Sequence, residues 1–264
     1  MTNLTVALGE YDTGWHDPKT SLGRAAALAR DARGAGADLL VLPEMCISGF
    51  TMDAENFAEP DNGPSIETIS QIAASEKLWI IAGAAMRDER GRFVNRALVL
   101  SPDGTLASSY EKQRLFSCAK ENEIYSPGHE PCVVEINGVK LGVFICFDLR
   151  FPELFREVGP DVDAFVVIAN WPETRQAHWD TLTRARAIEN QCYMIAVNRI
   201  GEGGELRYAG GSVAYDAWGT RCDLPAPNGQ LRIAGIASAQ VQRARESFPI
   251  ARSSDYAPMA RRAK

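Results

Sequence analysis

The sequence predicts an α/β protein whose strands form mixed sheet layers. Short apolar segments alternate with segments of helical periodicity near the N-terminus and again after Cys146. Other apolar segments are joined directly by turn signals such as Asn137-Gly138, which are typical of antiparallel hairpins. Several apolar segments end on polar residues, and the carboxyl ends of strands are where open α/β folds bind ligands.

Seven elements are expected in the first part of the chain. Short apolar runs bounded by turn residues predict buried strands, and apolar residues spaced three and four apart predict helices. The expected strands are Leu4 to Leu8, Asp38 to Leu42, Leu78 to Ala85, Asn95 to Leu100 and Ser108 to Lys112, and the expected helices are Ser21 to Gly34 and Ser65 to Lys77.

The second part of the chain begins with an expected hairpin whose second strand ends at Cys146. Further strands and helices follow, with a glycine-rich loop over Gly201 to Gly211 and an irregular tail from Arg245. The expected strands are Val133 to Ile136, Val139 to Ile145, Ala164 to Ala169, Tyr193 to Asn198, Ser212 to Tyr215 and Leu231 to Ala237, and the expected helices are Pro152 to Val158 and His178 to Glu189.

Composition indicates an ordinary globular protein. The chain has 264 residues, 45% hydrophobic and 23% charged, and we expect one domain over residues 1–264 with an extended tail from about 245. The net charge is -6 and the only basic cluster is Arg261-Arg262, so nucleic acid is not an expected partner. No apolar run approaches the ~20 residues of a membrane span, so no membrane association is expected.

The cysteines indicate a reducing setting. Six of them are scattered along the chain, with no C-x-x-C pair and no Cys/His spacing of a metal site. The N-terminal residues show no basic region followed by an apolar core, so we expect no signal peptide. These features predict a cytoplasmic protein with free thiols and no bound metal.

Four polar residues follow expected strands and are brought together if those strands share one sheet edge. They are Glu44, Lys112, Cys146 and Asn170. Taken singly, Cys146 is better explained as a packed thiol, and Glu44 and Lys112 as surface charges. Together they form a chemical set. The thiolate is the nucleophile, a desolvated glutamate serves as base, and an ammonium stabilises an oxyanion.

Three blocks that contain these residues resemble the signature blocks of the nitrilase superfamily of carbon–nitrogen hydrolases, and in the same order. They are Leu42-Pro43-Glu44, Tyr110-Glu111-Lys112 and the run Cys146-Phe147-Asp148-Leu149-Arg150-Phe151-Pro152-Glu153. The resemblance implies a four-layer α-β-β-α sandwich with two mixed sheets, a Glu-Lys-Cys triad and no cofactor.

The same resemblance implies roles for individual residues. Glu44 is the implied general base, Lys112 the oxyanion-stabilising cation and Cys146 the nucleophile. The Phe147 N–H completes the oxyanion hole with Lys112. Glu121, before Pro127-Gly128, matches the assisting glutamate, and Glu123 remains an alternative.

Within the superfamily, the cysteine block resembles the branch of omega-amidases and deaminated-glutathione amidases, and Asn170-Trp171-Pro172 resembles bacterial omega-amidase-like members. The implied substrate is a small amide with a distal carboxylate, of the 2-oxoglutaramate or 2-oxosuccinamate type. Arg150 is the expected carboxylate ligand, because guanidinium binds carboxylates bidentately. A structural ion pair remains its alternative. Thr174 is an expected hydrogen-bond donor, and Trp171 is either pocket wall or core.

Two other functions stay open. In the first, the same chemistry acts on deaminated glutathione or an N-carbamoyl amine. In the second, the chain is a catalytically silent binding protein with the nitrilase fold. The expected partners are a small-molecule amide and further copies of the chain, since the resemblance implies a homodimer or larger assembly.

Overall fold

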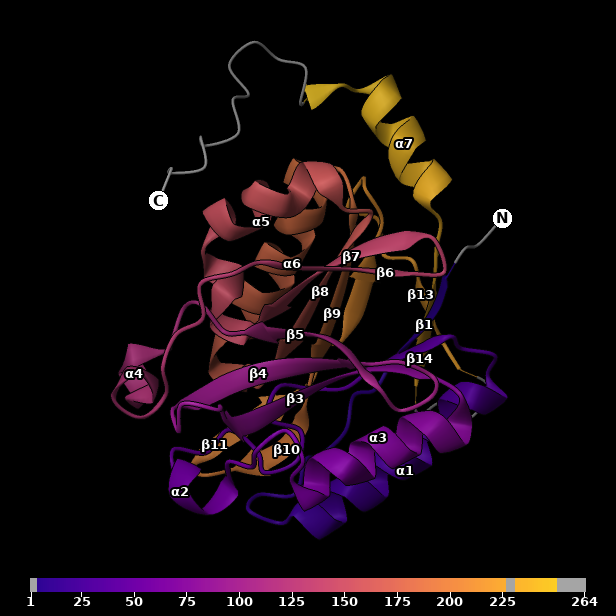
Figure 1. Cartoon of the computed structure of the whole chain (residues 1–264). Helices are drawn as coiled ribbons and strands as arrows, with labels where there is room; N and C mark the ends of the chain where they lie inside the picture. Colours follow the sequence, from indigo (N-terminus) through magenta and orange to yellow (C-terminus); the bar gives the residue numbers. More distant parts are fainter. Residues whose placement is uncertain (1–3, 227–230, 251–264) are drawn as a thin grey trace.

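In a computed structural model of the protein, two mixed sheets face each other and helices cover their outer sides (Figure 1). The structure describes residues 4–226 and 231–250. The larger sheet runs β13 (Asp223–Pro225), β14 (Arg232–Ile236), β1 (Leu4–Leu8), β2 (Leu39–Val41), β3 (Trp79–Arg87), β4 (Phe93–Leu100) and β5 (Leu106–Glu111). The smaller runs β12 (Val213–Tyr215), β9 (Tyr193–Asn198), β8 (Ala164–Ala169), β7 (Val139–Ile145) and β6 (Cys132–Ile136).

The helices divide between the two outer faces. Helices α1 (Pro18–Gly34) and α3 (Pro64–Glu76) cover the larger sheet, and α5 (Pro152–Val158) and α6 (Gln176–Asn190) cover the smaller one (Figure 1). The remaining helical segments are α2 (Ala54–Phe57), α4 (Glu121–Ile124) and α7 (Ser238–Ser247), with 3-10 turns η1 (Ser117–Ala119), η2 (Cys146–Arg150), η3 (Gly159–Asp161) and η4 (Glu173–Arg175). The four-layer α-β-β-α sandwich is confirmed.

Alternation along the strands explains the layers. Leu39 and Val41 of β2 pack between the two sheets, whereas Leu40 faces the cluster formed with α1 and α3. Successive strand side chains point to opposite faces, so a strand that is apolar throughout needs cover on both. Strands β1, β2 and β3 are parallel, as are β7, β8 and β9. The loops that follow these parallel strands therefore begin at the same edge of each sheet.

The expected hairpin at Asn137-Gly138 is confirmed. Strands β6 and β7 pair antiparallel, from Cys132 with Val143 to Ile136 with Val139. Asn137 and Gly138 have φ of 50° and 75°, the left-handed region that a tight two-residue turn requires. The hairpin fixes the register of β7, and thus the position at which Cys146 leaves the sheet.

Two expectations about the second half are wrong. The glycine-rich stretch after Asn198 is not a loop throughout, because β10 (Ile200–Gly203) and β11 (Leu206–Ala209) pair as an antiparallel hairpin. The irregular tail does not start at Arg245, because α7 continues to Ser247. Arg245 donates hydrogen bonds to the carbonyls of Gly159 and Val162, which anchor the helix end. Residues 251–264 of the expected tail lie outside the described residues.

Among the described residues, every helix is too short or too polar to span a bilayer.

Candidate active site

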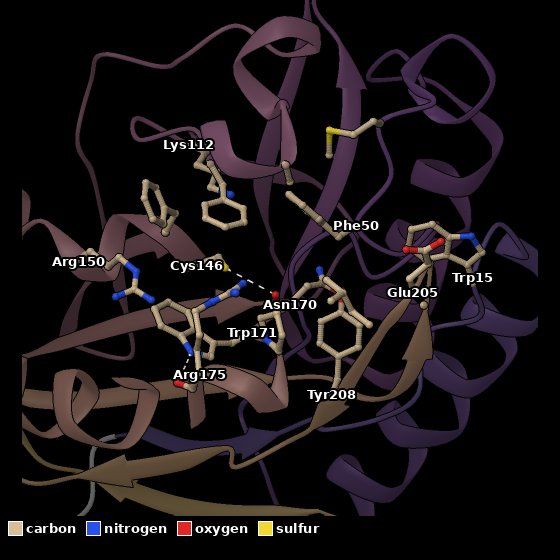
Figure 2. A pocket seen from close by; sticks show the side chains of 18 residues that line it. Trp15, Phe50, Lys112, Cys146, Arg150, Asn170, Trp171, Arg175, Glu205 and Tyr208 are labelled. Atoms are coloured by element: carbon tan, nitrogen blue, oxygen red, sulfur yellow. Dashed lines mark hydrogen bonds between the residues drawn. The ribbon is translucent and has the colours of Figure 1, made fainter. Parts of the chain in front are cut away.

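The three sequence blocks meet at one end of the sandwich. Glu44 follows β2, Lys112 follows β5 and Cys146 follows β7. The Lys112 Nζ lies 2.8 Å from Glu44 Oε1 and 2.9 Å from Glu121 Oε2, and all three side chains are fully buried. Lys112 and Cys146 both line a cavity of about 180 Å³. Figure 2 shows both side chains among those that line it. Of the four residues predicted to share a pocket, Lys112, Cys146 and Asn170 line this cavity, whereas Glu44 lies buried against Lys112 and does not line it.

Glu44 is held by donors on both carboxylate oxygens. Oε1 accepts from Lys112 Nζ and from Asn95 Nδ2, each at 2.8 Å, and Oε2 accepts from the Asn170 backbone N–H at 2.8 Å. The backbone of Glu44 packs directly against β3, because a Cβ on Gly83 of that strand would lie 2.6 Å from Glu44 Cα. No side chain fits there, so the neighbouring strand needs a glycine for Glu44 to take this position.

Glu121, rather than Glu123, joins the buried cluster. Both of its carboxylate oxygens accept from Lys112 Nζ, at 2.9 and 3.0 Å, and the Phe116 N–H donates to Oε2 at 2.6 Å. Glu123, two residues on in α4, is exposed. Burial opposes the charge of Lys112, but the carboxylates of Glu121 and Glu44 outweigh it and place the pKa of the ammonium above its usual value. The surroundings of Lys112 therefore favour its ammonium form.

Cys146 sits in a strained turn that a buried carboxylate holds in place. Its φ is 45°, an uncommon value for a residue with a side chain, at the junction of β7 and η2. The Asp148 carboxylate closes the turn by accepting the Ile145 N–H at 3.0 Å, the Arg114 N–H at 2.8 Å and the Tyr110 hydroxyl at 2.9 Å. The turn directs the thiol into the cavity, where Sγ lies 3.9 Å from the Asn170 carbonyl oxygen.

The surroundings of Cys146 favour the protonated thiol. Burial, and then the charge of Glu44, raise the pKa of Cys146 well above its usual value, and Lys112 only partly offsets them. Attack by sulfur therefore requires a base that removes the proton as the reaction proceeds. The Glu44 carboxylate is close by, because it contacts Lys112, which lines the cavity together with Cys146.

One wall of the cavity carries two guanidinium groups. The Arg150 guanidinium carbon lies 4.7 Å from the centroid of the Trp171 ring, and that of Arg175 lies 5.2 Å from the centroid of Phe116. Neither forms an ion pair with a carboxylate in residues 4–226 or 231–250. Arg150 Nη2 lies 3.1 Å from His178 Nδ1. Burial and the charge of Arg175 both lower the pKa of Arg150.

Within residues 4–226 and 231–250, the structural ion pair that was the alternative for Arg150 is therefore absent. Trp171 combines its two predicted roles, because it is 2% exposed, packs in the core and also lines the cavity. The predicted role of Thr174 has no support, since η4 turns its side chain to the exterior and the cavity lining omits it.

Sequence reasoning missed several contributors to the cavity, among them Arg175, Glu205 and Tyr208. Arg175, next to the predicted Thr174, reaches it from η4. Tyr208 and Glu205 reach it from the β10–β11 hairpin, on the far side from Arg150 in Figure 2. A glycine-rich stretch gives no signal of which side chains it presents, so the hairpin residues could not be found without the fold.

Comparison with known proteins agrees with this geometry. The family described as "Carbon-nitrogen hydrolase" matches residues 5–246. The chain belongs to this family. The omega-amidase YafV of Escherichia coli (strain K12) is 34% identical over 97% of this chain and 98% of its own length. The 2-oxoglutaramate amidase of Bacillus subtilis (strain 168) is 29% identical, covering 93% of this chain and 95% of that protein.

Solved structures give the same result. XC1258 from Xanthomonas campestris, a CN-hydrolase superfamily protein with an arsenic adduct in its active site, has a TM-score of 0.86 at 36% identity, over 93% of this chain and 95% of its own. Nit3 of Saccharomyces cerevisiae, a nitrilase-superfamily member, has a TM-score of 0.85 at 24% identity over 94% of each chain, which confirms the fold. The chain is thus a carbon–nitrogen hydrolase of the omega-amidase-like kind, an enzyme that acts on amides.

Proposed function

We propose that the protein hydrolyses a small carboxylate-bearing amide, of the 2-oxoglutaramate or 2-oxosuccinamate type, to the acid and ammonia through a thioester on Cys146. One observation carries the proposal. The Glu44–Lys112–Glu121 cluster adjoins a cysteine in a cavity of about 180 Å³. The wall of this cavity holds two arginines that pair with no carboxylate of residues 4–226 or 231–250. Relatives named omega-amidase and 2-oxoglutaramate amidase support this substrate class.

The first half-reaction forms the thioester. Glu44 takes the proton of the Cys146 thiol as sulfur attacks the amide carbon. The oxygen of the tetrahedral intermediate is stabilised by the Lys112 ammonium and the Phe147 N–H. When the intermediate collapses, the C–N bond breaks and Glu44 returns the proton to nitrogen, which leaves as ammonia.

The second half-reaction uses the same groups. Glu44 takes a proton from a water molecule, whose oxygen attacks the thioester carbon. Collapse of this intermediate breaks the C–S bond, and the proton on Glu44 returns to sulfur. Glu121 acts by fixing Lys112, whose Nζ it contacts with both carboxylate oxygens.

Arg150 and Arg175 bind the distal carboxylate in this proposal, and Trp171 forms the wall beneath them. Charge-assisted hydrogen bonds are worth about 1.5–3 kcal/mol each. Replacing either arginine by glutamine should therefore raise KM for a carboxylate-bearing amide by about 10- to 100-fold. The uncharged propionamide should be hydrolysed about as well as before, because its complex never used the guanidinium.

The first assay is ammonia release from 2-oxoglutaramate by the wild type and Cys146→Ala, followed by Arg150→Gln and Arg175→Gln. Arg33→Gln is the matched control, since Arg33 is exposed at the end of α1. Hydrolysis of propionamide without preference for carboxylate-bearing amides would contradict the substrate class while leaving the amidase chemistry in place.

The remaining candidates keep the same cysteine chemistry on deaminated glutathione or an N-carbamoyl amine. Release of carbon dioxide together with ammonia would identify a carbamoyl substrate. A silent binding protein is disfavoured by family membership and by the complete buried cluster beside the cysteine.

Assembly and location belong to the same proposal. A homodimer or larger assembly packed near the late helices is supported by exposed apolar side chains there, including Ile188 on α6 and Phe248 after α7, and light scattering would measure its mass. A cytoplasmic location is supported by six free cysteines, all of them among the described residues.

A further inference from the structure

The Asn170 side chain is a pocket residue that the proposed mechanism leaves unused. It follows β8, is 5% exposed and lines the cavity beside Cys146 (Figure 2). Its Nδ2 donates to the Glu44 carbonyl oxygen at 2.7 Å, whereas its Oδ1 accepts no hydrogen bond from the described part of the chain. A buried acceptor without a donor costs about 1–3 kcal/mol, so a ligand that donates to it is favoured.

The orientation of this carboxamide is fixed by its surroundings. Turning it over would bring Oδ1 to the place of Nδ2, 2.7 Å from the Glu44 carbonyl oxygen, where two acceptors would face each other. Nδ2 is also 3.4 Å from Glu44 Oε2, which likewise requires a donor at this position. The unpaired oxygen therefore points away from the Glu44 backbone.

The position of the departing nitrogen follows from the contacts of Glu44. Oε1 already accepts two hydrogen bonds of 2.8 Å, from Lys112 and Asn95. Oε2 accepts one of 2.8 Å from the Asn170 N–H and a longer one of 3.4 Å from Asn170 Nδ2, so it is the less strongly bonded oxygen and the better acceptor for the thiol proton. The nitrogen that receives this proton must then lie beside Asn170, on the side where Sγ is 3.9 Å from the Asn170 carbonyl.

We propose that Asn170 Oδ1 accepts an N–H of the substrate's primary amide and then of the released ammonia, making Asn170 a catalytic residue that recognises the leaving group. This rests on the proposed amide hydrolysis. A primary amide has two N–H groups, of which one faces Glu44 Oε2 and the other Oδ1. When the C–N bond breaks and Oε2 returns its proton, the ammonia keeps its hydrogen bond to Oδ1. An ester has no N–H to offer, and an N-methyl amide presents a methyl group in place of one.

The test compares succinamate with its isosteric ester, monomethyl succinate, in Asn170→Ala and Asn95→Ala. Asn95 is the matched control because its Nδ2 also donates to the Glu44 carboxylate and its Oδ1 is also unpaired, but it does not line the cavity. The readout is the amide-to-ester ratio of kcat/KM within each variant, which reports acylation and does not depend on how much of the protein is folded. Wild-type hydrolysis of N-methylsuccinamate is measured alongside.

Asn170→Ala should lower the amide-to-ester ratio by about tenfold or more, whereas Asn95→Ala should change it by less than about threefold. The wild type should cleave N-methylsuccinamate poorly. An equal change of the ratio in both variants would overturn the assignment and leave Asn170 as a positioning residue for Glu44. If the wild type cleaves neither succinate derivative, the proposed substrate class fails, and the same ratio is measured on an amide that it does cleave and the methyl ester of that acid.

Discussion

Replacing Lys112 by methionine should destabilise the protein and remove its activity, and the size of both effects follows from the buried cluster. Methionine keeps the length and unbranched shape of the lysine side chain but removes its charge. The Nζ atom makes three contacts of 2.8–3.0 Å with Glu44 and Glu121, all at zero exposure. The variant leaves two buried carboxylates with no cation between them.

The magnitude is large for a single substitution. Coulomb's law at an effective dielectric constant of about 20 gives an attraction of about 6 kcal/mol for unit charges 2.8 Å apart, part of which offsets desolvation. Breaking buried pairs in this way costs about 3–5 kcal/mol. We expect the melting temperature to fall by about 6–20 °C, at about 2–4 °C per kcal/mol for a chain of this size. Loss of the oxyanion cation should lower kcat by at least about 100-fold.

The loss of stability should depend on pH. In the variant, the like charges of two carboxylates in one buried site repel each other, because no cation lies between them. Protonation of the carboxylates in acid removes this repulsion, whereas at neutral pH it persists. Lys112→Met should therefore be closest to the wild type in acid and furthest from it at neutral pH.

Thermal unfolding at several pH values, with circular dichroism as the probe, measures this effect. The double variant Lys112→Met with Glu121→Gln should recover part of the lost stability, because it removes one of the two uncompensated carboxylates. A Lys112→Met protein as stable as the wild type at neutral pH would refute the view that the cluster is a buried, charge-balanced unit.

Three further outcomes are expected. Burial and then the neighbouring carboxylates raise the pKa of the Cys146 thiol. The rate of its alkylation by iodoacetamide, followed by peptide mass spectrometry, should therefore still increase with pH above pH 9, and a rate that levels off near neutral pH would contradict this. Gly83→Ala should lower the free energy of unfolding by about 1–3 kcal/mol and lower kcat, because the new Cβ would lie 2.6 Å from the backbone of Glu44. Its control is Gly23→Ala, at an open helical position, which should leave the free energy of unfolding in urea undiminished. Glu121→Gln should lower kcat/KM by about 100-fold and Glu123→Gln should leave it unchanged; equal effects would remove the distinction between the buried and the exposed glutamate.

The leaving-group proposal adds a reason for the position of Asn170 in the sheet. Glu44 and Asn170 follow strands of different sheets, β2 and β8, and their backbones and side chains are joined by hydrogen bonds. The two sheets therefore meet at the atoms that exchange the proton. Their relative position is set by the apolar core between them, which connects core packing directly to the geometry of catalysis.

The sequence by itself determined the elements of this protein and the ends of the strands that carry chemistry. Apolar runs such as Ala164 to Ala169 and the Asn137-Gly138 turn are local signals, because backbone geometry and burial constrain residues within a few positions of each other. The order of Glu44, Lys112 and Cys146 along the chain was enough to indicate the family, since the signature blocks are contiguous in sequence.

Only the tertiary structure decided which side chains complete the cavity and which charges are paired. The charged partners of Arg150 depend on residues that the fold brings together from separate loops. The same is true of the position of Arg175 beside Arg150 in the cavity wall. Glu121 and Glu123 are both acids in one short helix, and burial against Lys112 is what separates them. The unpaired oxygen of Asn170 was equally invisible in the sequence, because hydrogen-bond satisfaction is a property of neighbours in space, which local patterns do not encode.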